Sequence, residues 1–260
     1  MHDPTRYQPT TRFTDRVKDY ERARPGYPAA LVPWLIEQAT LVPGDPVADL
    51  GAGTGLFTRD LLAAELQVYG VEPNAVMRGA AERAFAERPN FISVDGRAEA
   101  TTLATGSVKL VTAAQAYHWF EPEPTYREAR RILAPGGFAA LIWNVRRVDA
   151  GFGKDYEELL MTHCPAYVEG QPHQAAPEEI AAFFAPAIPV AHSFDYQQTF
   201  NYEMLKARLL SSSYTPKEGD PARAVVLAAL RRLYDRHAQY DSIQFHYDCR
   251  VFASPIADMR

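Results

Sequence analysis

The residues best suited to bind a ligand form the stretch DLGAGTGLF, in the first quarter of the chain. Its notable members are Asp49, Gly51, Gly53 and Gly55. Glycine adopts positive φ without strain and lets a ligand approach the backbone without meeting a Cβ. The stretch is therefore a candidate binding loop between a strand and a helix, and a tight turn that holds no ligand is the alternative.

Two familiar phosphate-binding loops do not match this stretch. The dinucleotide fingerprint G-x-G-x-x-G requires a glycine at the position that Leu56 occupies. The Walker A loop ends in Gly-Lys followed by Ser or Thr, and the stretch contains no lysine. We therefore expect a ligand that lies against the backbone and does not need its phosphates neutralised there.

A carboxylate follows the second apolar run of the chain. Residues 67–71 predict a strand, and Glu72 comes directly after it. A carboxylate at the tip of a strand can accept hydrogen bonds from both hydroxyls of a ribose. The alternative is an acid favoured by the dipole of the next helix, but the position directly after the strand favours the ribose role. Asn74 is expected to cap that helix.

Short apolar runs alternate with amphipathic segments up to residue 144, which predicts an α/β fold with a parallel sheet. The runs that predict its strands are 46–50, 67–71, 91–95, 108–116 and 138–144. Two later runs, 192–201 and 243–252, predict strands that complete the same sheet. Residues 146–190 lack this pattern and are expected to form a cap over the sheet edge.

One domain with an embellishment fits this organisation better than two. We expect a single domain over residues 1–260, in which 191–260 supply the last strands and their helices. Helix and strand signals both fail between Val168 and Pro177. Limited proteolysis is therefore expected to cut first between these two residues.

The composition argues against several classes of function. A net charge of −5 disfavours nucleic-acid binding, which normally needs a basic patch. The two cysteines, Cys164 and Cys249, favour a reduced, cytoplasmic setting. No secretion signal is evident, and no apolar run reaches the length of a membrane helix. His163 and Cys164 have no partner pair at ligand spacing, so no metal site is expected.

Five motifs occur in order along the chain: VADLGAGTGLF, VYGVEPNAVM, SVDGRAEA, LVTAAQAYHWF and REARRILAPGGFAALIWN. Together they resemble class I S-adenosylmethionine-dependent methyltransferases, of the type 11 small-molecule subgroup. The resemblance covers residues 13–144, including RFTDRVKDYERARPGYP, and is weaker in LLSSSYTP and the last strand. It implies a donor-binding core over 13–144, with S-adenosyl-L-methionine as cofactor. It also implies a Rossmann-like, doubly wound, mostly parallel seven-stranded sheet with an antiparallel last strand and a small cap.

The resemblance implies donor-binding roles for residues in the first four of these motifs. Asp49 would order the glycine loop and face the methionine amino group, while Glu72 would take the ribose hydroxyls. Gln115 would lie near the methionine portion. The glycines that would let this portion lie on the backbone are Gly51, Gly53 and Gly55.

Other residues would surround the adenine or close over the donor. Those implied beside the adenine are Pro73, Asn74 and Met77, and those flanking its amino edge are Gly96, Arg97 and Ala98. Filling the core is the alternative role for Met77. From the N-terminal segment, Tyr20 and Arg24 would close over the donor, with Arg24 suited to its carboxylate.

The residues after the fourth and fifth predicted strands are the candidates for catalysis. His118 has a pKa range suited to a general base, and fixing its own loop is an equal alternative. Arg146 leaves the fifth strand, and solvated surface charge is its alternative. If the two strands are neighbours, both side chains would reach one acceptor. A basic pair would suit an acidic acceptor such as a carboxylate or an enolic or phenolic oxygen.

These features favour an enzyme that methylates an oxygen or nitrogen of a small metabolite. Aromatic residues with a few polar groups suit a small-molecule pocket rather than a groove for protein or nucleic acid. A non-methylating enzyme of the same fold, such as a natural-product cyclase, is one alternative, because fold and cofactor do not decide the reaction. A donor-binding regulatory protein is another, and the intact Asp49, glycine loop and Glu72 count against it. A monomer or a homodimer is expected.

Overall fold

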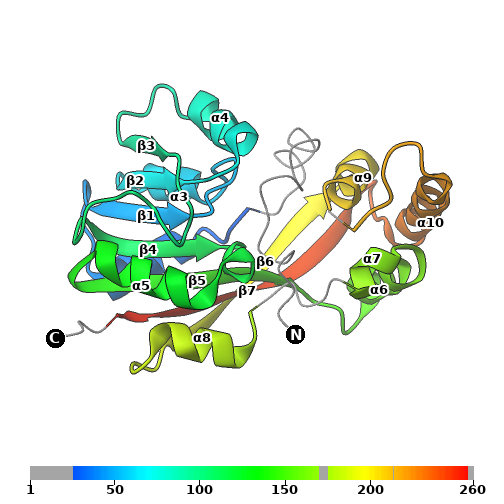
Figure 1. Cartoon of the computed structure of the whole chain (residues 1–260). Coiled ribbons are helices and arrows are strands. Elements are labelled where there is room, and N and C mark those ends of the chain that lie inside the picture. The colour runs from blue at the N-terminus through cyan, green and yellow to red at the C-terminus, as the bar shows by residue number, and fades with distance from the viewer. Residues whose placement is uncertain (1–25, 170–174, 213, 257–260) are drawn as a thin grey trace.

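The computed structural model describes residues 26–169, 175–212 and 214–256, and its centre is a seven-stranded sheet (Figure 1). The strand order is β3-β2-β1-β4-β5-β7-β6. The strands are β1 Pro46–Leu50, β2 Gln67–Val71, β3 Phe91–Val94, β4 Val108–Ala114, β5 Leu133–Arg146, β6 Val190–Phe200 and β7 Ile243–Pro255. This is the Rossmann-like, doubly wound α/β fold expected from the sequence.

The direction of the strands divides the sheet into two parts. Strands β1 to β5 are parallel, whereas β7 is antiparallel to both β5 and β6, with β6 at the edge. The last strand is therefore antiparallel, as expected. The order of the parallel strands reverses between β1 and β4, and ligands bind at such switch points, beyond the carboxyl ends of the strands. The glycine loop follows β1 and Gln115 follows β4, so both lie at this point.

Helices cover both faces of the sheet, and the side chains of each strand point alternately to the two faces. In β5, Phe138, Ala140 and Ile142 join the core beneath α2, α3 and α4, while Leu141 and Trp143 join the core beneath α5 and α8. These helices are α2 Leu31–Ala39, α3 Thr58–Ala63, α4 Ala75–Ala84, α5 Pro122–Ile132 and α8 Pro177–Phe184.

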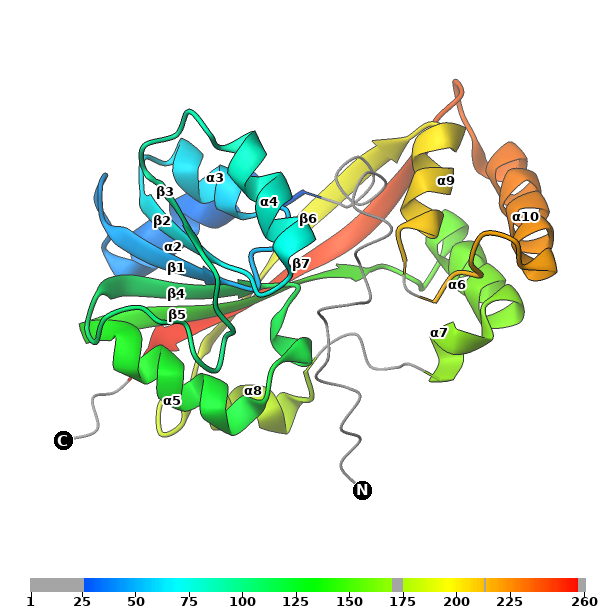
Figure 2. The same cartoon turned by 45° about the horizontal axis from the view of Figure 1, so that its top comes forward.

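Four further helices gather around the far ends of β6 and β7 and form a separate cluster, here called the cap (Figures 1 and 2). They are α6 Gly151–His163, α7 Pro165–Glu169, α9 Tyr202–Leu210 and α10 Pro221–His237. The segment expected to be the cap, 146–190, is thus divided. Its helices α6 and α7 belong to the cap, but Phe183 and Phe184 of α8 are buried in the core beneath α5. Helices α9 and α10 contribute to the cap from later in the sequence.

One strand connects the cap to the sheet core. Along the same face of β7, Phe245 and Tyr247 are buried in the cap, whereas Cys249, Val251 and Ala253 are buried beneath α2 and α3. The rigid ladder of β7 therefore fixes the cap relative to the sheet. The single-domain organisation and the cleavage between Val168 and Pro177 stay predictions, because residues 170–174 lie outside the described part of the chain.

Candidate active site

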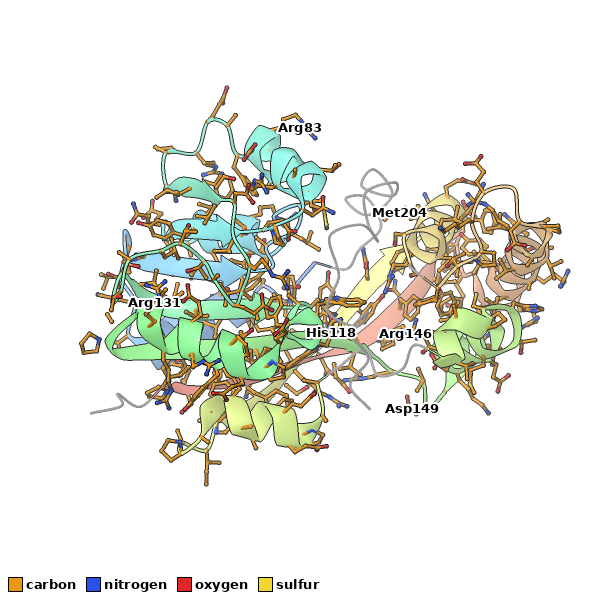
Figure 3. The ribbon with its side chains drawn as sticks, in the orientation of Figure 1. Arg83, His118, Arg131, Arg146, Asp149 and Met204 are labelled. Atoms are coloured by element: carbon orange, nitrogen blue, oxygen red, sulfur yellow. The ribbon has the colours of Figure 1, made fainter. Side chains whose placement is uncertain are left out.

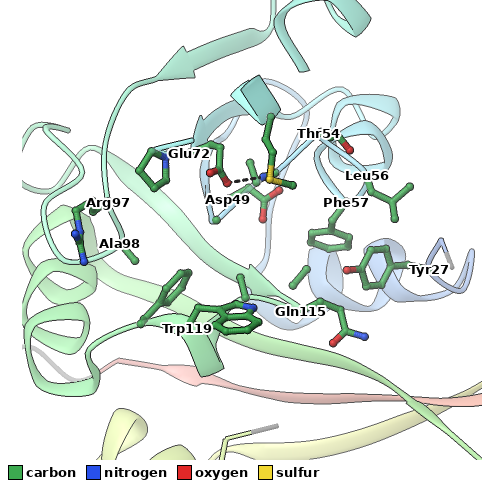
Figure 4. Close-up of a pocket in the computed structure, with 18 of the residues that line it drawn as sticks. Tyr27, Asp49, Thr54, Leu56, Phe57, Glu72, Arg97, Ala98, Gln115 and Trp119 are labelled. Atoms are coloured by element: carbon green, nitrogen blue, oxygen red, sulfur yellow. Dashed lines mark hydrogen bonds between the residues drawn. The ribbon is translucent and has the colours of Figure 1, made fainter. Parts of the chain in front are cut away.

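A cavity lies at the switch point, beyond the carboxyl ends of β1, β2 and β4 (Figure 4). It is lined by residues from each of the donor-binding motifs found in the sequence. Those expected and found there are Asp49, Gly51, Gly53, Glu72, Pro73, Met77, Arg97, Ala98 and Gln115. The fold thus brings together residues from four separate strand ends. Tyr20 and Arg24 lie outside the described residues.

Two of the expected glycines are not among the residues that line the cavity. Gly55 has φ of +87°, and a Cβ there would lie 2.3 Å from Cε2 of Phe85. At Gly96, a Cβ would lie 2.9 Å from the carbonyl oxygen of Thr101. Both glycines therefore permit close packing of the protein against itself, which spacing along the sequence does not distinguish from ligand contact.

Asn74 is also absent from the cavity lining. Its Oδ1 accepts hydrogen bonds from the backbone N–H groups of Val76 and Met77, so it caps α4. This is the capping role that the sequence predicted. The adenine contact implied by the family resemblance is not evident for this side chain.

Asp49 is buried at the base of the glycine loop, with only 1% of its surface exposed. Its two oxygens accept hydrogen bonds from the hydroxyls of Thr58 (2.7 Å) and Thr112 (2.9 Å). Burial raises the pKa of Asp49 to about 6, the two hydroxyls oppose this shift, and the charge of Glu72 adds to it. The carboxylate therefore joins the loop to α3 and β4, and a nearby cation would favour its ionised form.

Glu72 is held by the backbone on both sides. Its Oε2 accepts a hydrogen bond from the N–H of Gly53 (2.9 Å), drawn in Figure 4, and its Oε1 accepts one from the N–H of Asn74 (2.8 Å). Burial raises its pKa, although the two backbone hydrogen bonds act in the opposite direction. A carboxylate has about four acceptor positions, so two remain for a ligand with adjacent hydroxyls.

The two glycines that line the cavity leave the backbone open to a ligand. Gly51 and Gly53 have φ of +68° and +60°, a region that favours glycine. A Cβ on Gly51 would lie 2.8 Å from the Cβ of Ala116, and a Cβ on Gly53 would lie 3.2 Å from Cε of Met77. Together with Asp49 and Glu72, this bare backbone fits S-adenosylmethionine, a cation that carries a ribose diol.

The tip of β4 is strained. Gln115 has φ of +55°, which is uncommon for any residue except glycine and occurs most often at functional sites. Two hydrogen bonds hold it: its N–H donates to the carbonyl of Ile142 (2.8 Å), and its Nε2 donates to the carbonyl of Asn144 (3.0 Å). Trp119 and Phe120, which follow this tip, form an aromatic wall of the cavity.

His118 lies in the short helix η3, Tyr117–Trp119, and is not among the residues that line the cavity. The indole Nε1–H of Trp143 donates a hydrogen bond of 3.4 Å to its Nδ1. In the neutral ring the proton therefore lies on Nε2, and Nδ1, which a base would use, already has a donor. This geometry favours the role of fixing the loop over that of a general base.

Arg146 does not line the cavity either, and the structure does not bring it together with His118 as expected. Strands β4 and β5 are neighbours, but Arg146 lies toward α6 while His118 lies near the middle of the molecule (Figure 3). Its Nη2 donates to Glu157 (2.8 Å) and to the hydroxyl of Tyr167 (2.6 Å). Because Glu157 already neutralises this guanidinium, the geometry does not support a basic pair around one acceptor, and the catalytic roles of His118 and Arg146 stay predictions.

The cavity also contains residues that the sequence did not indicate, chief among them Arg208. It projects from α9, far along the chain, and is only 8% exposed. The other unexpected lining side chains are Tyr27, Thr54, Leu56, Phe57 and Glu99. The sole sequence signal near Arg208 is the hydroxyl-rich run that begins at Ser211, one turn later.

In the described part of the chain, no group of three or more His, Cys, Asp or Glu side chains is arranged to hold a metal ion. None of the helices seen in residues 26–169, 175–212 and 214–256 combines the length and the apolar character needed to cross a membrane.

Comparison with known proteins gives consistent results. Residues 48–141 match the family model described as a methyltransferase domain. An uncharacterized methyltransferase of Mycobacterium tuberculosis is 36% identical over 57% of this chain and 58% of its own length, so the match spans little more than half of that relative. An uncharacterized methyltransferase-like protein of Schizosaccharomyces pombe is 28% identical over 93% of this chain and 94% of its own length.

Solved structures share the fold. A protein described as a type II methyltransferase from Anaeromyxobacter dehalogenans has a TM-score of 0.70 and 24% identity, with 90% of this chain and 98% of that chain covered. Structures of this fold have been solved with S-adenosylmethionine bound. The motifs, the cavity and these matches agree: residues 48–141 match a methyltransferase domain, and the chain shares the fold of S-adenosylmethionine-dependent methyltransferases of known structure.

Proposed function

We propose that this protein transfers the methyl group of S-adenosylmethionine to an oxygen or nitrogen of a small metabolite. The observation that carries the proposal is the cavity in which the bare backbone of Gly51 and Gly53 lies between two buried carboxylates, Asp49 and Glu72. A loop that bound a phosphate would need a cation or several uncommitted N–H donors. This loop contains no lysine or arginine, and the N–H groups of Gly51, Gly53 and Gly55 already donate within the protein.

The donor-binding residues have distinct proposed roles. Glu72 would accept hydrogen bonds from the ribose hydroxyls, and Asp49 would stabilise the positive end of the donor. Met77 and Ala98 would contact the adenine. When bound, S-adenosylmethionine supplies a methyl group on a sulfonium, and the electron pair of the broken carbon–sulfur bond stays on sulfur.

The remaining work of the protein is positioning and exclusion of water. Displacement of a methyl group from a sulfonium needs alignment more than it needs a strong acid or base. Trp119, Phe120 and Phe57 close the cavity with apolar surface, and the strained tip at Gln115 fixes one wall. A cavity whose aromatic walls adjoin a small number of placed charged groups supports a small acceptor. A cytoplasmic setting, a monomer or homodimer, and no nucleic-acid partner complete the proposal.

Two measurements test it in order. Calorimetry with S-adenosylhomocysteine should show one site per chain, and well-folded protein that binds neither this product nor the donor would refute the proposal. Incubation with methyl-labelled donor and a metabolite extract should then transfer label to a small molecule. Donor binding without any transfer would favour the non-methylating enzyme of the same fold.

A further inference from the structure

Arg208 is a buried cation without an acidic partner among the described residues. Its side chain has one hydrogen bond there, from Nη1 to the hydroxyl of Ser212, and this bond is long at 3.4 Å. Its Nε is buried and has no partner. The groups that influence it electrostatically are Tyr247, Tyr214, Tyr156 and a second cation, Arg146, and none of these is a carboxylate. Burying an uncompensated charge is costly, so this arrangement needs an explanation.

Arg146, the second arginine of the cap, has the carboxylate partner that Arg208 lacks among the described residues. Arg146 pairs with Glu157 at 2.8 Å and donates to Tyr167, and its guanidinium lies 5.5 Å from the ring centres of both Tyr156 and Tyr167. The same chain therefore provides a carboxylate for one buried guanidinium and not for the other. Only Arg208, the one without the carboxylate, lines the cavity.

Two buried hydroxyls in the same cluster also have no partner. Within the described residues, the hydroxyl groups of Tyr156 and Tyr247 make no hydrogen bond, although each residue is only 1% exposed. Both rings pack on Phe245, with centroid separations of 5.1 Å and 5.2 Å. Burial raises the pKa of Tyr156, which keeps its phenol protonated and able to donate. Buried polar groups in native proteins nearly always have partners, so these two phenols are donors that a ligand can use.

We propose that Arg208, Tyr156 and Tyr247 form the acceptor site and bind a carboxylate of the molecule that is methylated. The proposal rests on the methyl transfer proposed above. Arg208 supplies a planar pair of N–H donors, the geometry that a carboxylate matches, and the phenols supply two more. Because Arg208 lines the same cavity as Asp49 and Gln115, a molecule held there lies beside the donor site.

The charge of the cluster favours a carboxylate over a phosphate. Arg146 and Glu157 neutralise each other, so Arg208 leaves the site with a single positive charge. A monoanion balances this charge, whereas a doubly charged phosphate would leave one negative charge in an apolar surrounding. If the methyl group is transferred to this carboxylate itself, no proton has to be removed and no general base is needed, which agrees with the engagement of Nδ1 of His118 by Trp143.

Calorimetry on the full chain loaded with S-adenosylhomocysteine tests the proposal, with phenylacetate and hexanoate as probes and their uncharged amides as controls. At least one carboxylate should bind, and its amide should bind at least about tenfold more weakly. Arg208→Met should weaken binding of the carboxylate at least about thirtyfold, and Tyr156→Phe and Tyr247→Phe should each weaken it about three- to tenfold. Arg208→Lys keeps the charge but not the planar pair of donors and should fall between. Arg232→Met, at an exposed arginine of α10, is the matched control and should change nothing.

Three outcomes would overturn the proposal while leaving the methyltransferase function standing. Amides that bind as well as carboxylates would show that charge is not recognised, and failure of both carboxylates to bind the loaded protein would count the same way. If Arg208→Met weakened binding of S-adenosylhomocysteine itself tenfold or more, Arg208 would hold the carboxylate of the donor instead. By contrast, wild-type protein that fails to bind S-adenosylhomocysteine would refute the proposed function first.

Discussion

The sheet side and the cap side of the cavity bury opposite charges. On the sheet side, Asp49 and Glu72 are carboxylates whose oxygens are held by hydroxyl and backbone donors, and no arginine of the described residues forms an ion pair with either. On the cap side, Arg208 is a guanidinium with no carboxylate among the described residues. A cationic donor matches the first and an anionic acceptor matches the second. With the proposed acceptor site, this division would orient the two ligands in one cavity by electrostatics.

The two sides also differ in how the chain builds them. The sheet side comes from consecutive strand tips within residues 49–115, where the regular crossover geometry places every loop at one edge. The cap side comes from α6, α9 and β7, which other helices and strands separate along the chain. The first arrangement follows from a repeated local unit, and the second depends on how distant segments pack.

The largest expected effect is a difference in the free energy of unfolding between variants of the two cap arginines. Arg146→Met should lower the free energy of unfolding by about 2–4 kcal/mol, because it leaves Glu157 and the hydroxyl of Tyr167 without their cation. Arg208→Met removes a charge that has no acidic partner and should change stability by less than about 1 kcal/mol. Urea denaturation of both variants measures the difference. Equal losses would mean that Arg208 is compensated in the folded protein.

The next effect tests the carboxylates of the sheet side. Glu72→Ala should weaken binding of S-adenosylhomocysteine by about 1–3 kcal/mol, the usual cost of losing hydrogen bonds to a charged acceptor. Glu128 is a matched control, because it is also 8% exposed but is bonded to Thr101 and Arg131 away from the cavity. Glu128→Ala should lower stability and leave the affinity unchanged. Unchanged affinity in Glu72→Ala would remove the ribose role from this residue.

A third effect concerns pH. The pKa of Asp49 in the folded protein is raised from about 3.8 to about 6, so the folded state binds its proton more tightly than the unfolded state. The stabilisation from this proton is complete below pH 3.8 and is lost as the pH rises through about 6. A cationic donor favours the ionised form, so affinity for S-adenosylmethionine should rise about tenfold from pH 5 to pH 7.5. The raised pKa of Glu72 acts in the same direction.

Calorimetry across this pH range should also show release of a proton on donor binding below pH 6. Asp49→Asn is the control, since an amide can still bond Thr58 and Thr112 but does not titrate. Its affinity should be lower than that of the wild type above pH 6 and should vary less with pH. A flat profile in the wild type would place the positive end of the donor away from Asp49.

The smallest effect is expected at His118. His118→Ala removes the acceptor for the indole N–H of Trp143 at 3.4 Å and should cost about 0.5–1.5 kcal/mol of stability. Label transfer to the acceptor found in the extract should fall by less than about threefold. A loss of tenfold or more, with donor binding intact, would return the role of general base to this residue.

The sequence by itself determined the donor half of this protein to a large extent. Strand patterns place Asp49, Glu72 and Gln115 directly after β1, β2 and β4, and parallel strands bring their tips to one edge whatever the details of packing. What spacing did not show is which residues of a motif turn toward the ligand. Gly55 packs on Phe85, and Asn74 caps α4, because backbone conformation and close neighbours decide these roles.

Tertiary structure alone decided how the charged groups are paired on the cap side of the cavity. Arg146 and Arg208 are equivalent by residue type, and local sequence shows neither Glu157 beside the first nor the absence of a carboxylate beside the second. That difference arises because α6, α9 and β7 meet only in the folded chain, through contacts between residues far apart in sequence. Periodicity reports which face of an element is buried, but the partner of a buried charge is a property of the packed cluster.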